Sequence, residues 1–372
     1  MGKNSAFNKQ KDFNYRIKLE ELKKTLPSYT YEFLDSRAQR NPNTAVSYAY
    51  DLNTFFEYLT EFCPPAKNVL IKDISLELLD ELSFQDINEY QKFLNAKDVT
   101  VIGSMNHQNN ISGIARKMSA LRSFYGYLCQ HDYLSNDPTV GATKQSRHAE
   151  EHAITRLTAD EVDDLLRVIK SGAIGSTRQQ KMLEKTQYRD FAILTLLLRT
   201  GIRVSECVSL DIDDFNFNEN SMCVVRKGGK EHYLYFDETT KEALLDYMEL
   251  ERPGFCESDK EKALFLTARK QRIGVRSIQK MVSKFASVAV SNKKITPHKM
   301  RSTYGTALYN KTGDIRLVAD VLGHSDINTT AKHYAATEEE HRRAAAKINP
   351  YNWYQNVFYT NKIITKTQYR IW

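Results

Sequence analysis

Apolar residues recur at three- and four-residue steps along three stretches in the first third of the chain. These stretches cover residues 29–59, 84–94 and 111–128, and this spacing places apolar side chains on one face of a helix. A Pro-Pro pair follows the first stretch, and an Asn-Asp-Pro turn follows the last. We therefore predict a compact helical domain over residues 28–138.

The segments that flank this domain lack an apolar stripe. Residues 1–27 are polar and rich in lysine, which predicts a flexible lead-in with room for one short helix. Residues 139–155 carry small and charged side chains, as a linker between domains does. We expect a second domain over 156–349 and an aromatic-rich tail over 350–372. The tail either packs on a partner subunit or DNA, or is an extension without a role, and the pattern leaves both open.

The second domain mixes helical and strand patterns. Thr158 and Glu161 have the spacing of a capping box, and an almost continuous apolar run over 188–200 predicts a buried helix that Gly201 ends. Two strand-like runs flank a basic turn at 226–230, whose glycines suit a hairpin. The runs cover residues 222–225 and 232–236. The predicted fold class is therefore mainly α with a small β-sheet.

Composition narrows the class of protein. The 372 residues allow two domains, and 53 Lys and Arg against 46 Asp and Glu give a net charge of +7 and a pI near 8.9. This mild basicity supports nucleic-acid binding only weakly. The five cysteines form no C-x-x-C pair, so we expect a reducing cytoplasm and neither a disulfide framework nor a zinc site. No run of 18 apolar residues and no secretory signal occurs, so no membrane span is expected.

One stretch, 296–334, concentrates side chains suited to catalysis. Thr296 and the proline after it are good first residues of a helix, and His298 and Arg301 are three apart on one helical face. Beyond a glycine turn and a second apolar helix, His324 follows Leu-Gly, and Tyr334 stands ten residues later.

Together with residues upstream, this stretch supplies two arginines, two histidines, one lysine and one tyrosine, without a carboxylate cluster. The set is Arg203, Lys227, His298, Arg301, His324 and Tyr334. A guanidinium fork can bond two non-bridging oxygens of a phosphodiester as charge develops on them, so two arginines can replace a metal clamp. A tyrosine hydroxyl can attack phosphorus and leave a covalent ester that conserves the bond energy. The set predicts phosphoryl transfer by a protein nucleophile, with no metal and no cofactor.

The blocks TGIRVSE, HKMR and LGHSD and the tyrosine after them resemble those of the tyrosine recombinase (phage integrase) family, in particular its XerC/XerD-like members. The resemblance covers about residues 28–348. It implies a helical core-binding domain and an α/β catalytic domain that form a C-shaped clamp on DNA. It also implies site-specific recombination through a 3′-phosphotyrosine and a Holliday junction.

The resemblance also implies a role for each residue. Arg203 and Arg301 would clamp the phosphate, His298 would transfer the proton and His324 would occupy the second histidine position. Lys227 of the basic hairpin would be the general acid, Tyr334 the nucleophile and Glu206 the supporting acid. Many members place the tyrosine nine residues after this histidine, whereas Tyr334 is ten after His324. We therefore expect the loop between the two to differ in geometry from that of those members.

The resemblance extends to partners. These are a double-stranded recombination site, further copies of the chain as a dimer on one site and a tetramer in the synapse, and a related recombinase or a DNA-bending factor. The candidate phosphate contacts are Arg116, Lys117 and Arg122 on the last helix of the first domain, and Lys230 of the hairpin. On local pattern alone, the solvated face of an amphipathic helix is the better interpretation of the three helical cations, and only the resemblance favours phosphate contacts. Lys227 could equally be a solvated hairpin tip.

Other readings remain open at this point. A type IB topoisomerase uses similar chemistry but reseals the strand to itself. A DNA-binding regulator could keep the fold without cutting, although none of the six polar residues is missing. A metal nuclease is disfavoured because the sequence offers no carboxylate cluster. Neither the target sequence nor the genetic role follows from the chain.

Overall fold

The computed structural model describes residues 6–95, 111–143, 155–172, 177–226, 229–258, 260–290 and 292–324. The chain divides into two compact units, one of residues 4–150 and one of residues 151–372 together with the first three residues. The division falls inside the predicted linker 139–155. Each unit is described by itself below.

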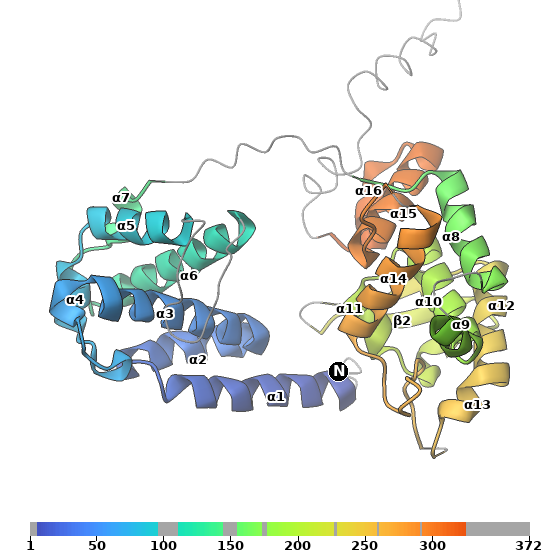
Figure 1. Ribbon diagram of the computed structural model, residues 1–372, viewed down its shortest axis with the longest axis horizontal. Coiled ribbons are helices and arrows are strands. Elements are labelled where there is room, and N and C mark those ends of the chain that lie inside the picture. Colours follow the sequence, from blue (N-terminus) through green and yellow to red (C-terminus); the bar gives the residue numbers. More distant parts are fainter. Residues whose placement is uncertain are drawn as a thin grey trace, which may run out of the picture. The chain divides into compact units, whose positions relative to one another are not determined.

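The N-terminal unit is a set of helices packed around α3 (Figure 1). Asn41 starts α3, because its side chain accepts a hydrogen bond from Thr44 N (3.2 Å) and the proline at the first helical position has no N–H to satisfy. The main helices of the unit are α1 (Ala6–Lys23), α2 (Tyr31–Arg40), α3 (Pro42–Phe62), α5 (Phe84–Asn95) and α6 (Ile111–Gln130). The shorter ones are α4 (Leu76–Glu81) and α7 (Pro138–Gly141).

Aromatic side chains fill the centre of this unit. Phe33 of α2 and Phe124 of α6 have ring centroids 5.3 Å apart, and Phe55 of α3 meets Tyr90 of α5 at 5.1 Å with edge-to-face geometry. All four side chains are buried. Rings in such arrangements contribute about 0.5–1.5 kcal/mol per pair beyond the area that they bury. The helical domain predicted from the periodicity is thus built on one aromatic core.

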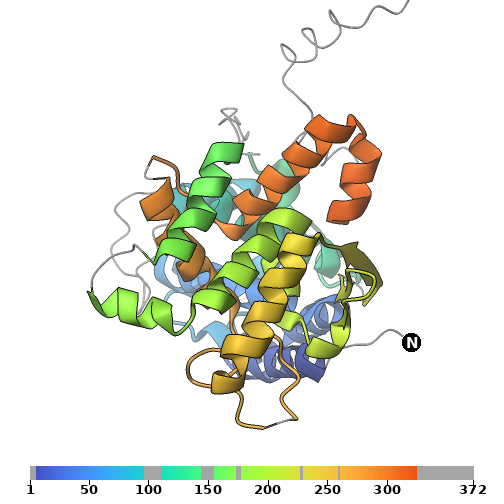
Figure 2. The same cartoon turned by 90° about the vertical axis from the view of Figure 1, so that its right-hand side faces the viewer.

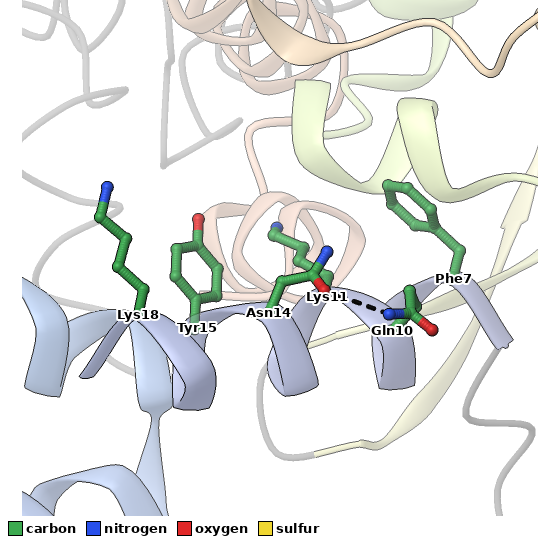
Figure 3. Close-up of a pocket in the computed structure, with 6 residues that line it drawn as sticks. All are labelled: Phe7, Gln10, Lys11, Asn14, Tyr15 and Lys18. Carbon is green, nitrogen blue, oxygen red and sulfur yellow. Dashed lines mark hydrogen bonds between the residues drawn. The ribbon is translucent and has the colours of Figure 1, made fainter. Parts of the chain in front are cut away.

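Residues 6–23 form the continuous helix α1, whereas the sequence predicted a flexible lead-in over 1–27. Leu19 is 1% exposed in the core of the unit, and Lys23 Nζ bonds Glu20 Oε1 (2.8 Å) and Asp35 Oδ1 (2.5 Å). Figure 3 shows six side chains that line a pocket on one side of α1: Phe7, Gln10, Lys11, Asn14, Tyr15 and Lys18. Few apolar residues anchor this helix, so local periodicity does not reveal it, and packing against α3 decides its conformation.

The C-terminal unit is organised around α10 (Gln187–Thr200), the buried helix predicted from its apolar run. It packs against α8, α12 and α15 (Figures 1 and 2). The helices of the unit are α8 (Ala159–Ser171), α9 (Thr177–Glu184), α11 (Val204–Ser209), α12 (Glu238–Asp246), α13 (Arg252–Phe255), α14 (Val275–Ala289), α15 (Pro297–Thr312) and α16 (Ile315–Leu322). A π-helical turn, Tyr247–Glu251, continues α12.

A small antiparallel sheet with strand order β1-β2-β3 completes this unit. Its strands are β1 (Phe215–Asn216), β2 (Ser221–Val225) and β3 (Glu231–Tyr235). Met222 pairs with Leu234 and Val224 with His232, so the predicted hairpin is present with its strand bounds shifted by one residue. The predicted fold class, mainly α with a small sheet, is confirmed.

The first described residues of this unit, just before α8, are held by side chains of α8, of α15 and of the segment between α14 and α15. Thr158 and Glu161 form the predicted capping box of α8. Leu157 N donates to Thr303 Oγ1 of α15 (3.0 Å), and Lys293 Nζ, which follows α14, bonds Glu161 (2.7 Å). These bonds tie the start of α8 to the helix that carries the HKMR block. No helix in the described part of the chain is long and apolar enough to cross a membrane.

The packing of α1 can be tested by replacing Leu19 with alanine. Removing a fully buried leucine side chain should destabilise the N-terminal unit by about 2–4 kcal/mol, measured as a lower midpoint of urea unfolding. Ile17→Ala on the same helix is the matched control, because Ile17 is 46% exposed. Equal, small effects of both substitutions would show that α1 is not part of the core.

Candidate active site

Arg203 stands where α10 gives way to α11. Gly201, with φ 63°, ends α10 in the left-handed conformation, and Ile202 is buried, so the backbone that carries Arg203 is fixed on both sides. Glu206 Oε2 accepts from Arg203 N (3.0 Å), and Glu206 Oε1 accepts from Arg203 Nη1 (2.8 Å). Glu206 is only 5% exposed, so the arginine is held by a buried carboxylate.

Gly201 also allows three elements to approach closely. A Cβ at this position would lie 2.5 Å from Tyr304 Cδ1 of α15 and 2.8 Å from Leu322 Cδ2 of α16. Real Cβ atoms do not come this close to other atoms. The glycine of the TGIRVSE block is therefore required both for its backbone conformation and for the packing of α15 and α16 against the turn.

Arg301 on α15 joins the same turn to α16. Thr296 caps α15 by accepting from Lys299 N (3.4 Å), as predicted. Arg301 is 3% exposed, and its guanidinium donates through Nη1 to Gly201 O and through Nη2 to Leu322 O. A buried charge needs hydrogen-bond partners, and here the partners are carbonyls at the ends of two helices.

The C-terminus of α16 is where these side chains meet. Arg203 Nη2 donates to Gly323 O (2.8 Å), next to the carbonyl bonded by Arg301. His324 follows directly, and its backbone N–H donates to Ala319 O (2.9 Å), which closes the helix. The structure therefore brings Arg203, Arg301 and the backbone of His324 together, although Arg203 and His324 are 121 positions apart.

A third arginine, Arg226, reaches the same helix end, and the sequence-based set did not include it. Its Nη2 donates to Val321 O (2.7 Å) and its Nη1 to Asp320 O (3.2 Å), while its Nε lies 4.0 Å from Glu206 Oε1. Burial lowers the pKa of Arg226, and the Glu206 carboxylate opposes that shift. Its signal in the sequence was its place in the basic hairpin, but nothing local separates it from the cations beside it.

The other predicted residues are placed as follows. His298 is exposed on the first turn of α15, one turn before Arg301. Lys227 and Tyr334 lie outside the described residues, although Arg226 marks where the hairpin begins. Among the residues described, no cluster of three or more His, Cys, Asp or Glu could hold a metal ion.

Of the candidate phosphate contacts predicted from the sequence, Lys117 is not on the surface as that role requires. Its side chain is 7% exposed, and burial lowers its pKa. Arg116 bonds Asp51 of α3, a buried carboxylate whose pKa is raised by burial and held down in part by Arg116. Arg122 is half-buried and Lys230 is exposed. Because Asp51 lies inside the unit and attracts cations, α6 does not present all three as an exposed basic stripe.

Comparison with known proteins identifies this arrangement. The model of the phage integrase family matches residues 155–341. The tyrosine recombinase XerC of Caldanaerobacter subterraneus subsp. tengcongensis is 32% identical over 354 residues, covering 92% of this chain and 91% of the relative. This chain belongs to the phage integrase family. The tyrosine recombinase XerS of Lactococcus lactis subsp. cremoris is 29% identical and covers 88% of this chain and 96% of the relative.

Solved structures share the fold of this phage integrase family member. XerH bound to palindromic difH substrate in a post-cleavage complex superposes with a TM-score of 0.60 at 17% identity, covering 84% of this chain and 82% of the other. A lambda integrase dimer bound to a core site gives 0.56 at 14% identity, covering 82% and 94%. The family and the class of activity predicted from the sequence, site-specific recombination by a tyrosine recombinase, are thereby confirmed.

Two glycine substitutions separate backbone conformation from packing at this site. Gly201 and Gly172 both have positive φ (63° and 67°), but a Cβ at Gly172 would meet nothing within 4 Å. Gly172→Ala should therefore cost about 1–2 kcal/mol of stability, the left-handed penalty alone. Gly201→Ala should cost a further 1–3 kcal/mol, roughly, from overpacking. Urea unfolding of both variants measures the difference, and equal losses would contradict the close approach of α15 and α16.

Proposed function

We propose that this protein breaks and rejoins DNA at specific sites through a covalent 3′-phosphotyrosine on Tyr334. The observation that carries the proposal is that Arg203, Arg301 and the backbone of His324 meet at the C-terminus of α16, where the buried Glu206 bonds Arg203. Guanidinium groups so placed suit a scissile phosphate, because two of them can bond its non-bridging oxygens while charge develops there.

In the cleavage step, the phenol oxygen of Tyr334 forms a bond to phosphorus and the bond to the 5′-oxygen breaks. His298, on the same helix as Arg301, accepts or relays the phenol proton. Lys227 donates a proton to the departing 5′-oxygen, and His324 bonds the phosphate. The support is positional: Arg301 and His298 share α15, His324 follows α16, and Lys227 adjoins Arg226.

Rejoining reverses these bonds. A 5′-hydroxyl from a second duplex attacks the phosphotyrosine and releases the phenol, which gives strand exchange through a Holliday junction. The covalent ester conserves the energy of the broken phosphodiester, so the proposed cycle needs no high-energy cofactor. The charge that develops on phosphorus is balanced by Arg203 and Arg301 rather than by a metal.

The proposed partners follow from this chemistry. Exchange between two duplexes requires a copy of the enzyme at each of four cuts, hence a dimer on one site and a tetramer in the synapse. The N-terminal unit would clasp one side of the duplex, with Arg116 and Arg122 of α6 as candidate phosphate contacts, and Lys230 of the hairpin would be a further contact in the C-terminal unit. A related recombinase or a DNA-bending factor could share the complex. A DNA substrate of this kind implies action at the nucleoid in the cytoplasm.

The nucleophile can be tested with Tyr334→Phe. The probe is a duplex that the wild-type chain selects by binding from a randomised pool, nicked so that the cut strand's short fragment diffuses away and the adduct accumulates. The variant should bind the probe within about threefold of the wild-type affinity and form no adduct that survives denaturing electrophoresis, because phenylalanine has no hydroxyl. Tyr188→Phe, at an exposed tyrosine of α10, should behave as wild type. An adduct with Tyr334→Phe would remove Tyr334 from this role.

A two-duplex assay separates recombination from the rival activities. Wild-type protein with two differently labelled duplexes should yield a four-way junction and exchanged products. A type IB topoisomerase-like enzyme would relax supercoiled DNA and give no exchange, and a regulator that only binds would do neither. Either of these results would contradict the proposal.

A further inference from the structure

Arg226 is a cation buried at a helix end by two carbonyl groups. Its side chain is 10% exposed, and its two terminal nitrogens donate to Asp320 O (3.2 Å) and Val321 O (2.7 Å). These carbonyls belong to the last turn of α16, where helix oxygens lack the usual intrahelical donors. Asp320 O also accepts from Gly323 N (2.8 Å), the residue that ends the helix. The negative end of the helix dipole lies there as well, which favours a cation. Arg226 thus joins the end of β2 to the end of α16.

Gly323 makes room for this contact. A Cβ at Gly323 would lie 1.9 Å from Arg226 Nη1 and 2.3 Å from Arg226 Cζ, and the residue has φ 61°. The glycine of the LGHSD block is therefore needed for two independent reasons. One is the left-handed turn that ends α16, and the other is the guanidinium packed against its α-carbon.

The three arginines divide the end of α16 among them. Arg226 takes the carbonyls of residues 320 and 321, while Arg301 and Arg203 take those of 322 and 323. In the proposed function, Arg203 and Arg301 also bond the scissile phosphate, whereas the N–H groups of Arg226 nearest the helix are directed at carbonyls. Its remaining polar atom, Nε, faces Glu206 at 4.0 Å and is buried without a hydrogen-bond partner.

We propose that Arg226 is a positioning residue for strand cleavage, and that it does not bind DNA phosphate. It holds the last turn of α16, and with it His324, against Arg203 and Glu206. This inference rests on the proposed function for the roles of Arg203 and His324. Its rival is that Arg226 is one more phosphate contact of the basic hairpin. Arg226 stands outside the TGIRVSE and HKMR blocks that carry Arg203 and Arg301, and all three of its nitrogens face groups of the protein: two carbonyls and the Glu206 carboxylate. Arg301 is buried against two carbonyls as well, so the binding and cleavage measurements below decide between the two roles.

The first experiment measures cleavage and binding separately in the full-length chain. Arg226→Gln should lower the rate of adduct formation on the selected nicked duplex at least tenfold and leave the dissociation constant and its salt dependence unchanged. Arg167→Gln, which removes an exposed arginine from α8, is the matched control and should change neither. A phosphate contact would instead weaken binding and reduce the slope of log K against log salt by about 0.9. That result would overturn the positioning role.

Chemical rescue distinguishes positioning from a loss of folded protein. With Arg226→Ala, added methylguanidinium in the millimolar range should restore part of the adduct rate, because a free guanidinium can occupy the vacated position between the carbonyls. The same concentration of ammonium, which lacks the planar fork, should not. Absence of rescue in a variant whose melting temperature matches the wild type would contradict the inference.

A double-mutant cycle tests the contact itself without any DNA. Gly323→Ala should lower the melting temperature more in the wild-type background than in the Arg226→Ala background, since the clash is present only in the former. Equal losses would show that Arg226 does not pack on Gly323.

The adduct assay separates failure of the proposed function from failure of this inference. If wild-type protein formed no adduct at all, the proposed function would fail. A normal adduct rate in Arg226→Gln would refute only the positioning role.

Discussion

The carbonyl groups at the end of α16 impose the constraint on which the site depends. The last four carbonyls of any helix lack partners inside it, and at a buried helix end they need donors from elsewhere. Here backbone N–H groups of Gly323 and His324 donate to Asp320 O and Ala319 O. The carbonyls of residues 321 and 322 receive guanidinium groups from the end of β2 and from α15, and Gly323 O receives that of Arg203 in the α10–α11 turn. The hydrogen bonds that the arginine side chains make to the end of α16 therefore also bring the cations of the site together.

The charge balance of this cluster suits an anionic ligand. Three guanidinium groups, those of Arg203, Arg226 and Arg301, bond carbonyls at the end of α16. Two of them, Arg203 and Arg226, face the buried carboxylate of Glu206. Burial and the charge of Arg226 also lower the pKa of His232 on β3. The side chains of Arg226 and Arg301 are buried and that of Arg203 is 36% exposed. A phosphodiester at this partly buried site would be attracted more strongly than in open water. The Glu206 carboxylate fixes the orientation of Arg203, and its single negative charge does not neutralise the three guanidinium groups.

The N-terminal unit follows a different logic. Its core is rich in aromatic residues, and the buried Asp51 pairs with Arg116 of α6, whose side chain stays 49% exposed. The same helix keeps Arg122 partly accessible. The amphipathic pattern of α6 correctly predicts which face is apolar, but it cannot show that Lys117 is buried while Arg116, which pairs with a buried acid on α3, stays at the surface.

The sequence by itself determined the features that depend on near neighbours along the chain. The caps at Thr158 and Thr296, the buried run that ends at Gly201 and the hairpin strands all follow from local rules of hydrogen bonding and side-chain spacing. It also determined the family through short blocks of residues. The helix α1, the burial of Lys117 and the contact of Arg226 with α16 were decided only by the tertiary structure. Each depends on partners far away in the sequence, because burial and hydrogen bonding between separate elements are properties of the packed chain and not of any one segment.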